Sequence, residues 1–227
     1  MAPKFLVFDM DDTLYLERDY ARSGFAAVGE WLASERGVAG FGDTAWQLFV
    51  AGERGDIFDR GLHAHGIECT AALVKTLVGI YREHAPAIAM AADARAYLAR
   101  APQEQPMALI TDGPAASQRA KIDALGLRAH LEPCVVTSEL PGDGAKPSPD
   151  AFVLVQRALG AEGSACCYVG DNPKKDFVAP HALGWTTVRI RRSGGLHHDL
   201  PSGDDVQIEI RSFDELATVL AIEQGVG

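Results

Sequence analysis

Three apolar segments of this chain stop abruptly at polar residues, and this pattern restricts the possible folds more than any other feature. Each has the composition of a strand buried on both faces and leads into an aspartate. They are Lys4–Phe8 before Asp9, Pro106–Thr111 before Asp112, and Ala165–Val169 before Gly170 and Asp171. Strands buried on both faces are typical of parallel sheets, and ligands bind at the carboxyl ends of such strands. We therefore expect a parallel sheet with an acidic site at one edge.

Weaker β-type segments alternate with helical segments along much of the remaining chain. Further strands are predicted at Cys134–Thr137, Thr186–Ile190 and Val206–Ile210. Helices are predicted between the strands at Ala115–Leu125, Ala151–Leu159 and Phe177–Leu183. This alternation predicts an α/β fold, in which helices cover both faces of a Rossmann-like parallel sheet.

The segment from residue 16 to residue 92 does not follow this alternation. It contains no convincing strand, and its apolar residues recur at helical spacing, as in Phe25, Val28, Trp31 and Leu32. We interpret residues 16–92 as a helical domain inserted after the first strand, and residues 1–15 with 93–227 as the α/β core domain. The chain has 227 residues, which suffices for one such core and a modest insertion.

The charge balance excludes some classes of partner. The chain has 21 Lys and Arg against 31 Asp and Glu, a formal net charge of −10. Such a protein has no basic field for nucleic acid or an anionic membrane, so an anionic substrate must be held by local groups. The four cysteines lack metal-site spacing and are interpreted as reduced thiols, and no signal-peptide pattern or long apolar run is present. We therefore expect a cytoplasmic protein that acts on a small molecule.

The polar residues at the predicted strand ends form a chemically consistent set. Three carboxylates that converge from the ends of separate strands would repel one another unless a cation lay among them. Mg²⁺ suits hard carboxylate oxygens, and Lys146 beside it would add positive charge within an acidic protein. The hydroxyl of Thr111 and nearby backbone amides could bind phosphate oxygens. A carboxylate nucleophile in such a site can form an aspartyl-phosphate, while a second carboxylate transfers protons.

Four motifs in this order resemble those of the haloacid dehalogenase-like hydrolases. The segment Phe8–Tyr15 (FDMDDTLY) resembles the first motif, hhhDxDxT, and Gly170–Asp176 (GDNPKKD) resembles the acidic fourth motif, GDxxxxD. Thr111 and Lys146 resemble the second and third motifs. The resemblance spans roughly residues 4–190, and it implies a phosphatase with a Rossmann-like core.

The resemblance also implies a role for each motif residue. Asp9 would attack phosphorus and bind Mg²⁺, while Asp11 would be the general acid and base and offer its backbone carbonyl to the metal. Thr111 and Lys146 would bind the phosphoryl group, and Asp171 would complete the protein ligands of Mg²⁺. Asp176 would support that loop by orienting either Lys146 or a water bound to the metal. Asp112 would offer its amide to phosphate or point away from it.

Other residues near these motifs have simpler interpretations. Lys174 and Lys175 are interpreted as surface charges. The segment 193–205, which contains His197 and His198, is interpreted as an exposed loop in which the histidines have no special role. The helical insertion resembles a type 1 (C1) cap, which would cover the site and select the substrate. Neither the substrate nor the oligomeric state follows from the sequence.

The leading functional hypothesis is a Mg²⁺-dependent phosphatase that hydrolyses a small phosphorylated metabolite. A phosphomutase or a phosphonatase could use the same core, although a phosphonatase needs a cap lysine and Lys75 is the only lysine of the insertion. A 2-haloacid dehalogenase needs neither a metal nor the second aspartate of the first motif, so Asp11 and Asp171 argue against it. A non-catalytic binding protein would be expected to lack Asp9 or a metal ligand.

Overall fold

The structure is a computed structural model that describes residues 3–102 and 105–222. The described residues form two compact units. The first contains the residues up to Glu17 and from Ala89 onward, and the second is Arg18–Ile88. The sequence-based division was placed a few residues away, after residue 15 and after residue 92.

The first unit is built around a six-stranded sheet in which every pairing is parallel. The strands are β1 (Phe5–Phe8), β2 (Met107–Thr111), β3 (Cys134–Val136), β4 (Cys166–Gly170), β5 (Thr186–Ile190) and β6 (Ile208–Ile210). Their order is β3-β2-β1-β4-β5-β6. The α/β Rossmann-like fold predicted from the sequence is therefore confirmed.

This strand order places a topological switch point between β1 and β4. The chain continues from β1 through β2 to β3 on one side of the sheet, and from β4 through β5 to β6 on the other. The loops leave β1 and β4 in opposite directions, which opens a crevice at the carboxyl ends of these two strands. Leu6 of β1 lies beside Met107 of β2 and Cys167 of β4, so all three strands reach this edge together.

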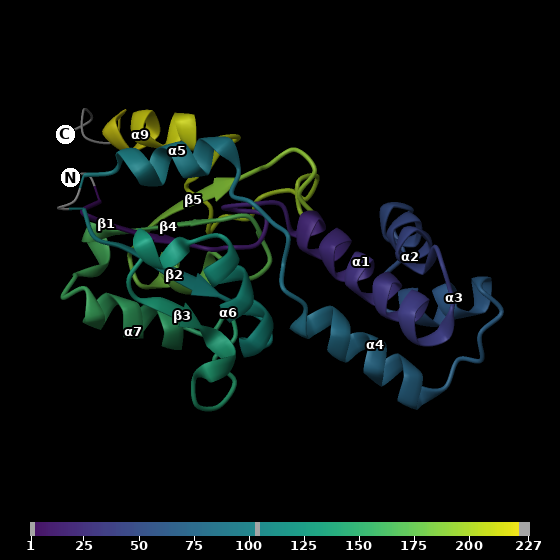
Figure 1. The fold of residues 1–227 in the computed structure, drawn as a ribbon. Coiled ribbons are helices and arrows are strands. Elements are labelled where there is room, and N and C mark those ends of the chain that lie inside the picture. Colours follow the sequence, from purple (N-terminus) through teal and green to yellow (C-terminus); the bar gives the residue numbers. More distant parts are fainter. Residues whose placement is uncertain (1–2, 103–104, 223–227) are drawn as a thin grey trace. The chain divides into compact units, whose positions relative to one another are not determined.

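Helices cover both faces of the sheet because alternate residues of a strand point to opposite faces. The helices of this unit are α5 (Ala92–Arg100), α6 (Ala115–Ala124), α7 (Asp150–Ala158), α8 (Val178–Ala182) and α9 (Phe213–Ile222). Phe8 of β1 packs against Tyr97 of α5 and Phe213 of α9. Its neighbour Val7 belongs to a cluster on the other face with Phe152 of α7. Figure 1 shows α5 beside α9 on one side of the sheet and α7 on the other.

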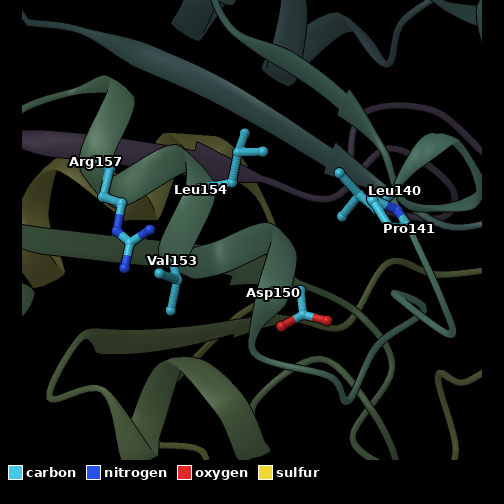
Figure 2. A pocket seen from close by; sticks show the side chains of 6 residues that line it. All are labelled: Leu140, Pro141, Asp150, Val153, Leu154 and Arg157. Carbon is cyan, nitrogen blue, oxygen red and sulfur yellow. The ribbon is translucent and has the colours of Figure 1, made fainter.

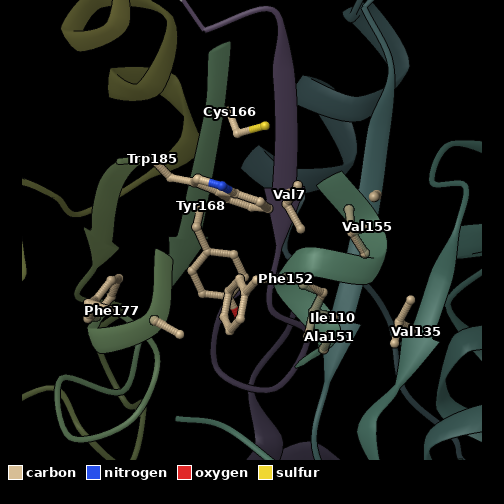
Figure 3. Packing of buried hydrophobic residues seen from close by; sticks show 12 residues of the cluster. Val7, Ile110, Val135, Ala151, Phe152, Val155, Cys166, Tyr168, Phe177 and Trp185 are labelled. Carbon is tan, nitrogen blue, oxygen red and sulfur yellow. The ribbon is translucent and has the colours of Figure 1, made fainter. Parts of the chain in front are cut away.

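Aromatic rings fill the cluster beneath α7 (Figure 3). Phe152 meets Tyr168 edge to face at 5.0 Å between ring centroids, and it meets Trp185 in the same way at 5.6 Å. The Trp185 indole nitrogen donates a hydrogen bond to Gln156, so its polar atom is satisfied although the ring is buried. This packing fixes Tyr168, whose hydroxyl reaches the candidate site described below.

The observed elements lie close to the predicted ones. The strand Thr186–Ile190 has the predicted bounds, and the other strands and the three predicted core helices differ by one or two residues at their ends. The helices α5 and α9 were not predicted. Three short 3₁₀ turns, at Leu127–Ala129, Thr137–Glu139 and Gly163–Ala165, were not predicted. Cys166 and Cys167 are buried and form no disulfide, as expected from their apolar surroundings.

The second unit contains most of a helical region made of α1 (Glu17–Arg36), α2 (Phe41–Val50), α3 (Ile57–Ala64) and α4 (Ala71–Glu83). It has its own apolar core, which includes Phe25, Val28, Phe41 and Leu77. Residues 18–88 contain no strand, in agreement with their helical periodicity. The role of this unit as a cap stays a prediction. None of the helices in the described residues combines the length and apolar character needed to cross a lipid bilayer.

Candidate active site

The candidate site is a small acidic cavity at the carboxyl ends of β1, β2 and β4. Its volume is about 100 Å³, and six of its lining residues are acidic. The lining residues are Asp9, Asp11, Asp12, Glu17, Asp112, Asp171, Asn172, Lys175 and His197. The structure therefore brings together four of the predicted site residues. A larger surface cavity of about 520 Å³ beside α7 has none of the predicted site residues in its lining (Figure 2).

Lys146 lies at the centre of a buried ion network. Its Nζ is 2.5 Å from Oδ1 of Asp9 and 2.8 Å from Oδ1 of Asp176, and it also donates to the Tyr168 hydroxyl at 3.0 Å. The Lys146 and Asp176 side chains have no solvent-exposed surface. Of the two roles that the sequence interpretation left open for Asp176, this contact corresponds to the orientation of Lys146. The other carboxylate oxygen of Asp9, Oδ2, accepts no hydrogen bond from the described residues and is therefore available to a ligand in the cavity.

Burial dominates the protonation of this network. Burial raises the pKa of Asp9 well above its ordinary value, with Lys146 opposing the shift and Asp176 and Asp171 adding to it. Burial alone would lower the pKa of Lys146, but Asp176 and Asp9 outweigh burial and hold that pKa well above its usual range. The lysine is therefore a fixed positive charge beside Asp9.

Asp11 is held by donors that the sequence analysis did not identify. Its Oδ1 accepts hydrogen bonds from Lys121 Nζ at 2.7 Å and from the Tyr15 hydroxyl, and its Oδ2 accepts from Gln118 Nε2 at 2.9 Å. Burial acts to raise the pKa of Asp11, but Lys121, Tyr15 and Gln118 together lower it below its usual value. Gln118 and Lys121 are polar residues three positions apart on one face of α6, and both are buried. Buried polar side chains on a helix that covers a sheet are the signal that could have identified them.

The second motif is fixed by side chains from three other segments. Thr111 is buried, and its Oγ1 accepts a hydrogen bond from Gln118 at 2.6 Å. Asp112 receives hydrogen bonds from Thr137 at 2.8 Å, from the Lys146 backbone at 3.2 Å and from Lys175 Nζ at 2.7 Å. Burial acts to raise the pKa of Asp112, but Lys146 and Lys175 outweigh burial and lower it.

These contacts place Lys175 in the candidate site beside Asp112. The charge of Asp112 is compensated by the ion pair with Lys175. The interpretation of Lys175 as a surface charge was wrong, because its side chain is only partly exposed and lines the cavity. Lys174 is exposed, as predicted.

Asp176 fixes the backbone of the fourth motif through hydrogen bonds. Its Oδ2 accepts hydrogen bonds from the backbone N–H groups of Asp171 at 3.2 Å and Asn172 at 2.9 Å. Gly170 allows this close approach, because a Cβ at this position would lie 2.7 Å from Asp176 Oδ2. Asp171 therefore faces the cavity from a fixed loop. Burial raises the pKa of Asp171 to about 6, with Asp176 adding to the shift.

The chemistry of these donors fits a hard divalent cation. Carboxylate oxygens of Asp9, Asp171 and Asp176 lie within 4.8 Å of one another. Because both oxygens of Asp176 already contact Lys146 or backbone N–H groups, Asp9 and Asp171 are the better placed ligands. A second group, Asp12 with Asp171 and His197, is equally compact. Both oxygens of Asp12, however, accept backbone hydrogen bonds, from Glu17 and Leu196, so Asp12 is a structural residue.

Two further residues of the cavity were missed by the sequence analysis. Glu17 lines it at the start of α1, and burial, followed by repulsion from Asp11, raises the pKa of Glu17 to about 7. His197 was interpreted as an ordinary loop residue, which was wrong, because its Nδ1 lies 2.9 Å from Oδ2 of Asp171. The available signal was its place in the loop after β5, which leaves the sheet at the carboxyl edge.

Comparison with known proteins identifies the family of this chain. A model of the haloacid dehalogenase-like hydrolases matches residues 3–184. The chain belongs to this family of hydrolases. The resemblance that the four motifs indicated is therefore confirmed. Asp9, Thr111 and Asp171 stand at the carboxyl ends of β1, β2 and β4.

Relatives with named activities match part of the chain. N-acylneuraminate-9-phosphatase of Rattus norvegicus is 31% identical over 105 residues, which are 46% of this chain and 42% of the relative. Phosphoserine phosphatase of Thermus thermophilus is 34% identical over 101 residues, which are 44% of this chain and 40% of the relative. The matches thus span about two fifths of the length of these relatives.

Solved structures of the same fold cover nearly the whole chain. The HAD-hydrolase YfnB from Bacillus subtilis, bound to magnesium, has a TM-score of 0.67 at 18% identity and covers 97% of this chain and 99% of its own. A 2-haloacid dehalogenase from Pseudomonas syringae has a TM-score of 0.66 at 20% identity and covers 98% of this chain and 100% of its own. At these identities the similarity concerns the fold alone.

Proposed function

We propose that this hydrolase is a Mg²⁺-dependent phosphatase that acts on a small phosphomonoester, such as a sugar phosphate or a nucleotide, through an aspartyl-phosphate on Asp9. The observation that carries the proposal is the buried arrangement in which Lys146 holds one oxygen of Asp9 while Asp171 lies across the same cavity. The partial similarity to two kinds of phosphatase supports phosphate monoesters as the substrate class.

In the proposed reaction, Oδ2 of Asp9 attacks phosphorus in line with the leaving oxygen. Lys146 keeps the nucleophile in place and offsets negative charge on the transferring group, as phosphoryl transfer requires. Thr111 and the backbone amides of its loop bind phosphoryl oxygens. Mg²⁺, held by Asp9, Asp171 and the backbone carbonyl of Asp11, would neutralise the phosphoryl oxygens.

Asp11 is assigned the proton transfers. It gives the leaving oxygen a proton that it must take up before the attack, and later takes one from the water that hydrolyses the aspartyl-phosphate, which restores its starting state. Its carboxylate is oriented by Tyr15, Gln118 and Lys121 in the structure. We further propose that the helical unit acts as a cap that selects the substrate.

The proposal can be tested by the hydrolysis of an aryl phosphate. Phosphate release is expected to require Mg²⁺ and to stop when EDTA is added. Asp9→Asn should reduce turnover to no more than a few per cent of the wild-type rate, because the amide cannot form the acyl phosphate. A matched control is Asp199→Asn, which removes one exposed carboxylate outside the cavity. Turnover by Asp9→Asn above a few per cent of the wild-type rate would refute the nucleophile assignment.

Dehalogenation is the second candidate, because solved dehalogenases are among the structures of similar fold. It predicts halide release from a 2-haloacid with no requirement for a metal, whereas the buried carboxylates Asp9 and Asp171 favour a cation. The phosphonatase alternative gains no support from Lys75, because this lysine is exposed on α4. Parallel assays of phosphate release and halide release separate the two candidate activities.

A further inference from the structure

His197 connects two residues of the fourth motif through both nitrogens of its ring. Its Nδ1 is 2.9 Å from Oδ2 of Asp171, and its Nε2 is 3.2 Å from Nδ2 of Asn172. Oδ1 of Asn172 accepts a hydrogen bond from the Lys174 backbone at 3.0 Å, so the NH₂ group of Asn172 faces the ring. Nε2 of His197 is therefore the acceptor, and Nδ1 carries the hydrogen that is donated to Asp171.

The loop that carries His197 is fixed by a fully buried arginine. Arg189 of β5 donates to the carbonyl of Asp171 at 3.1 Å through Nε and to the carbonyl of His197 at 2.7 Å through Nη2. The same guanidinium also binds the Leu200 carbonyl at 2.9 Å. One rigid side chain thus holds the backbones of both partners of the His197–Asp171 hydrogen bond in register.

A second anchor comes from the first motif. Oδ2 of Asp12 accepts a hydrogen bond from the backbone of Leu196, the residue before His197, at 2.8 Å. Asp12 has a φ of 54°, and it is the only residue other than glycine with a positive φ among those described. Its side-chain hydrogen bonds to Leu196 and to Glu17 offset the cost of this backbone conformation.

We propose that His197 is a positioning residue for the metal site. By donating to Oδ2 of Asp171, it fixes the rotation of that carboxylate so that Oδ1 is presented to Mg²⁺. This inference rests on the proposed function, because it assigns Asp171 as a Mg²⁺ ligand. A metal-binding carboxylate that is itself hydrogen bonded is pre-oriented, and removal of such a partner typically weakens metal binding by about 10–100-fold.

The geometry of amide side chains provides a sharp test. In asparagine the amide nitrogen occupies the place of the histidine Nδ1, whereas in glutamine it occupies the place of Nε2. His197→Asn therefore retains a donor for Asp171, and His197→Gln does not. His198→Gln is a control in the same loop, because within the described part of the chain His198 forms hydrogen bonds through its backbone and not through its side chain. The measurements are the binding of Mg²⁺ by titration calorimetry and of Mn²⁺ by electron paramagnetic resonance, and thermal unfolding verifies that each variant is folded.

The expected result is that His197→Gln binds either ion about 10-fold more weakly than the wild type, while His197→Asn and His198→Gln stay within about twofold. At saturating Mg²⁺ the KM for an aryl phosphate should change little, since His197 acts through Asp171. Equal metal affinity of the wild type and His197→Gln would overturn this inference alone. Equal weakening by His197→Asn and His197→Gln would also overturn it, because the Nδ1 donor would not be the cause. Absence of metal binding by the wild type would overturn the proposed function and this inference with it.

Discussion

Replacement of Asp171 by asparagine should stabilise the metal-free protein, although it removes a proposed metal ligand. Burial raises the pKa of Asp171 from 3.8 to about 6. Each unit of pKa shift corresponds to about 1.36 kcal/mol, so the ionised carboxylate costs the folded state about 3 kcal/mol at neutral pH. Asparagine keeps an oxygen that can accept the hydrogen bond from His197 and carries no charge. We therefore expect a gain of about 2–3 kcal/mol in the free energy of unfolding at pH 7.

The pH dependence gives this prediction a definite sign. A carboxyl group with a raised folded-state pKa binds its proton more tightly in the folded than in the unfolded protein. The free-energy cost of ionising Asp171 in the folded protein is therefore absent well below pH 3.8. This cost grows as the pH rises toward 6 and is complete above about pH 6. The advantage of Asp171→Asn should accordingly shrink to below about 1 kcal/mol at pH 4.

The assay is urea unfolding in EDTA at pH 4 and pH 7, with Asp199→Asn as the control for the loss of one exposed carboxylate. Saturating Mg²⁺ should then stabilise the wild type by about 2.7 kcal/mol at 100 times its dissociation constant and leave Asp171→Asn unchanged. The reasoning fails if Asp171→Asn is less stable than the wild type in EDTA at pH 7. It also fails if the difference between the two proteins is the same at both pH values.

Three other substitutions test separate parts of the structure. Lys146→Met should lower the free energy of unfolding by about 3–5 kcal/mol in urea, because it leaves two buried carboxylates without their cation; a loss below about 1 kcal/mol would contradict this. Gly163→Ala should cost about 1–3 kcal/mol without changing turnover per folded molecule, because its Cβ would lie 2.1 Å from the Leu183 carbonyl oxygen; unchanged thermal stability would contradict it. Gln118→Leu should lower the free energy of unfolding by about 1–3 kcal/mol and lower kcat more than it raises KM, because Thr111, Asp11 and the Asp112 carbonyl lose a buried donor. A wild-type kcat would disprove that Gln118 positions these residues.

The candidate site shows which contacts can be anticipated from a sequence. Asp9, Thr111 and Asp171 follow buried strands, and parallel strands bring their carboxyl ends to one edge of the sheet, so their proximity could be predicted. The pairing of Lys146 with Asp9 spans 137 residues and was expected only through the family resemblance. The ordinary composition of the loop after β5 gave no indication of the hydrogen bond between His197 and Asp171.

The sequence by itself determined the parallel α/β core, the helical region after β1 and the order of the acidic loops. These features follow from local periodicity and from the abrupt polar ends of buried strands, which depend on neighbours in the chain. Only the tertiary structure decided which cations pair with the other carboxylates: Lys121 with Asp11 and Lys175 with Asp112. The reason is that a buried charge must be paired wherever the fold brings a partner within a few ångströms, and no spacing along the chain encodes that distance.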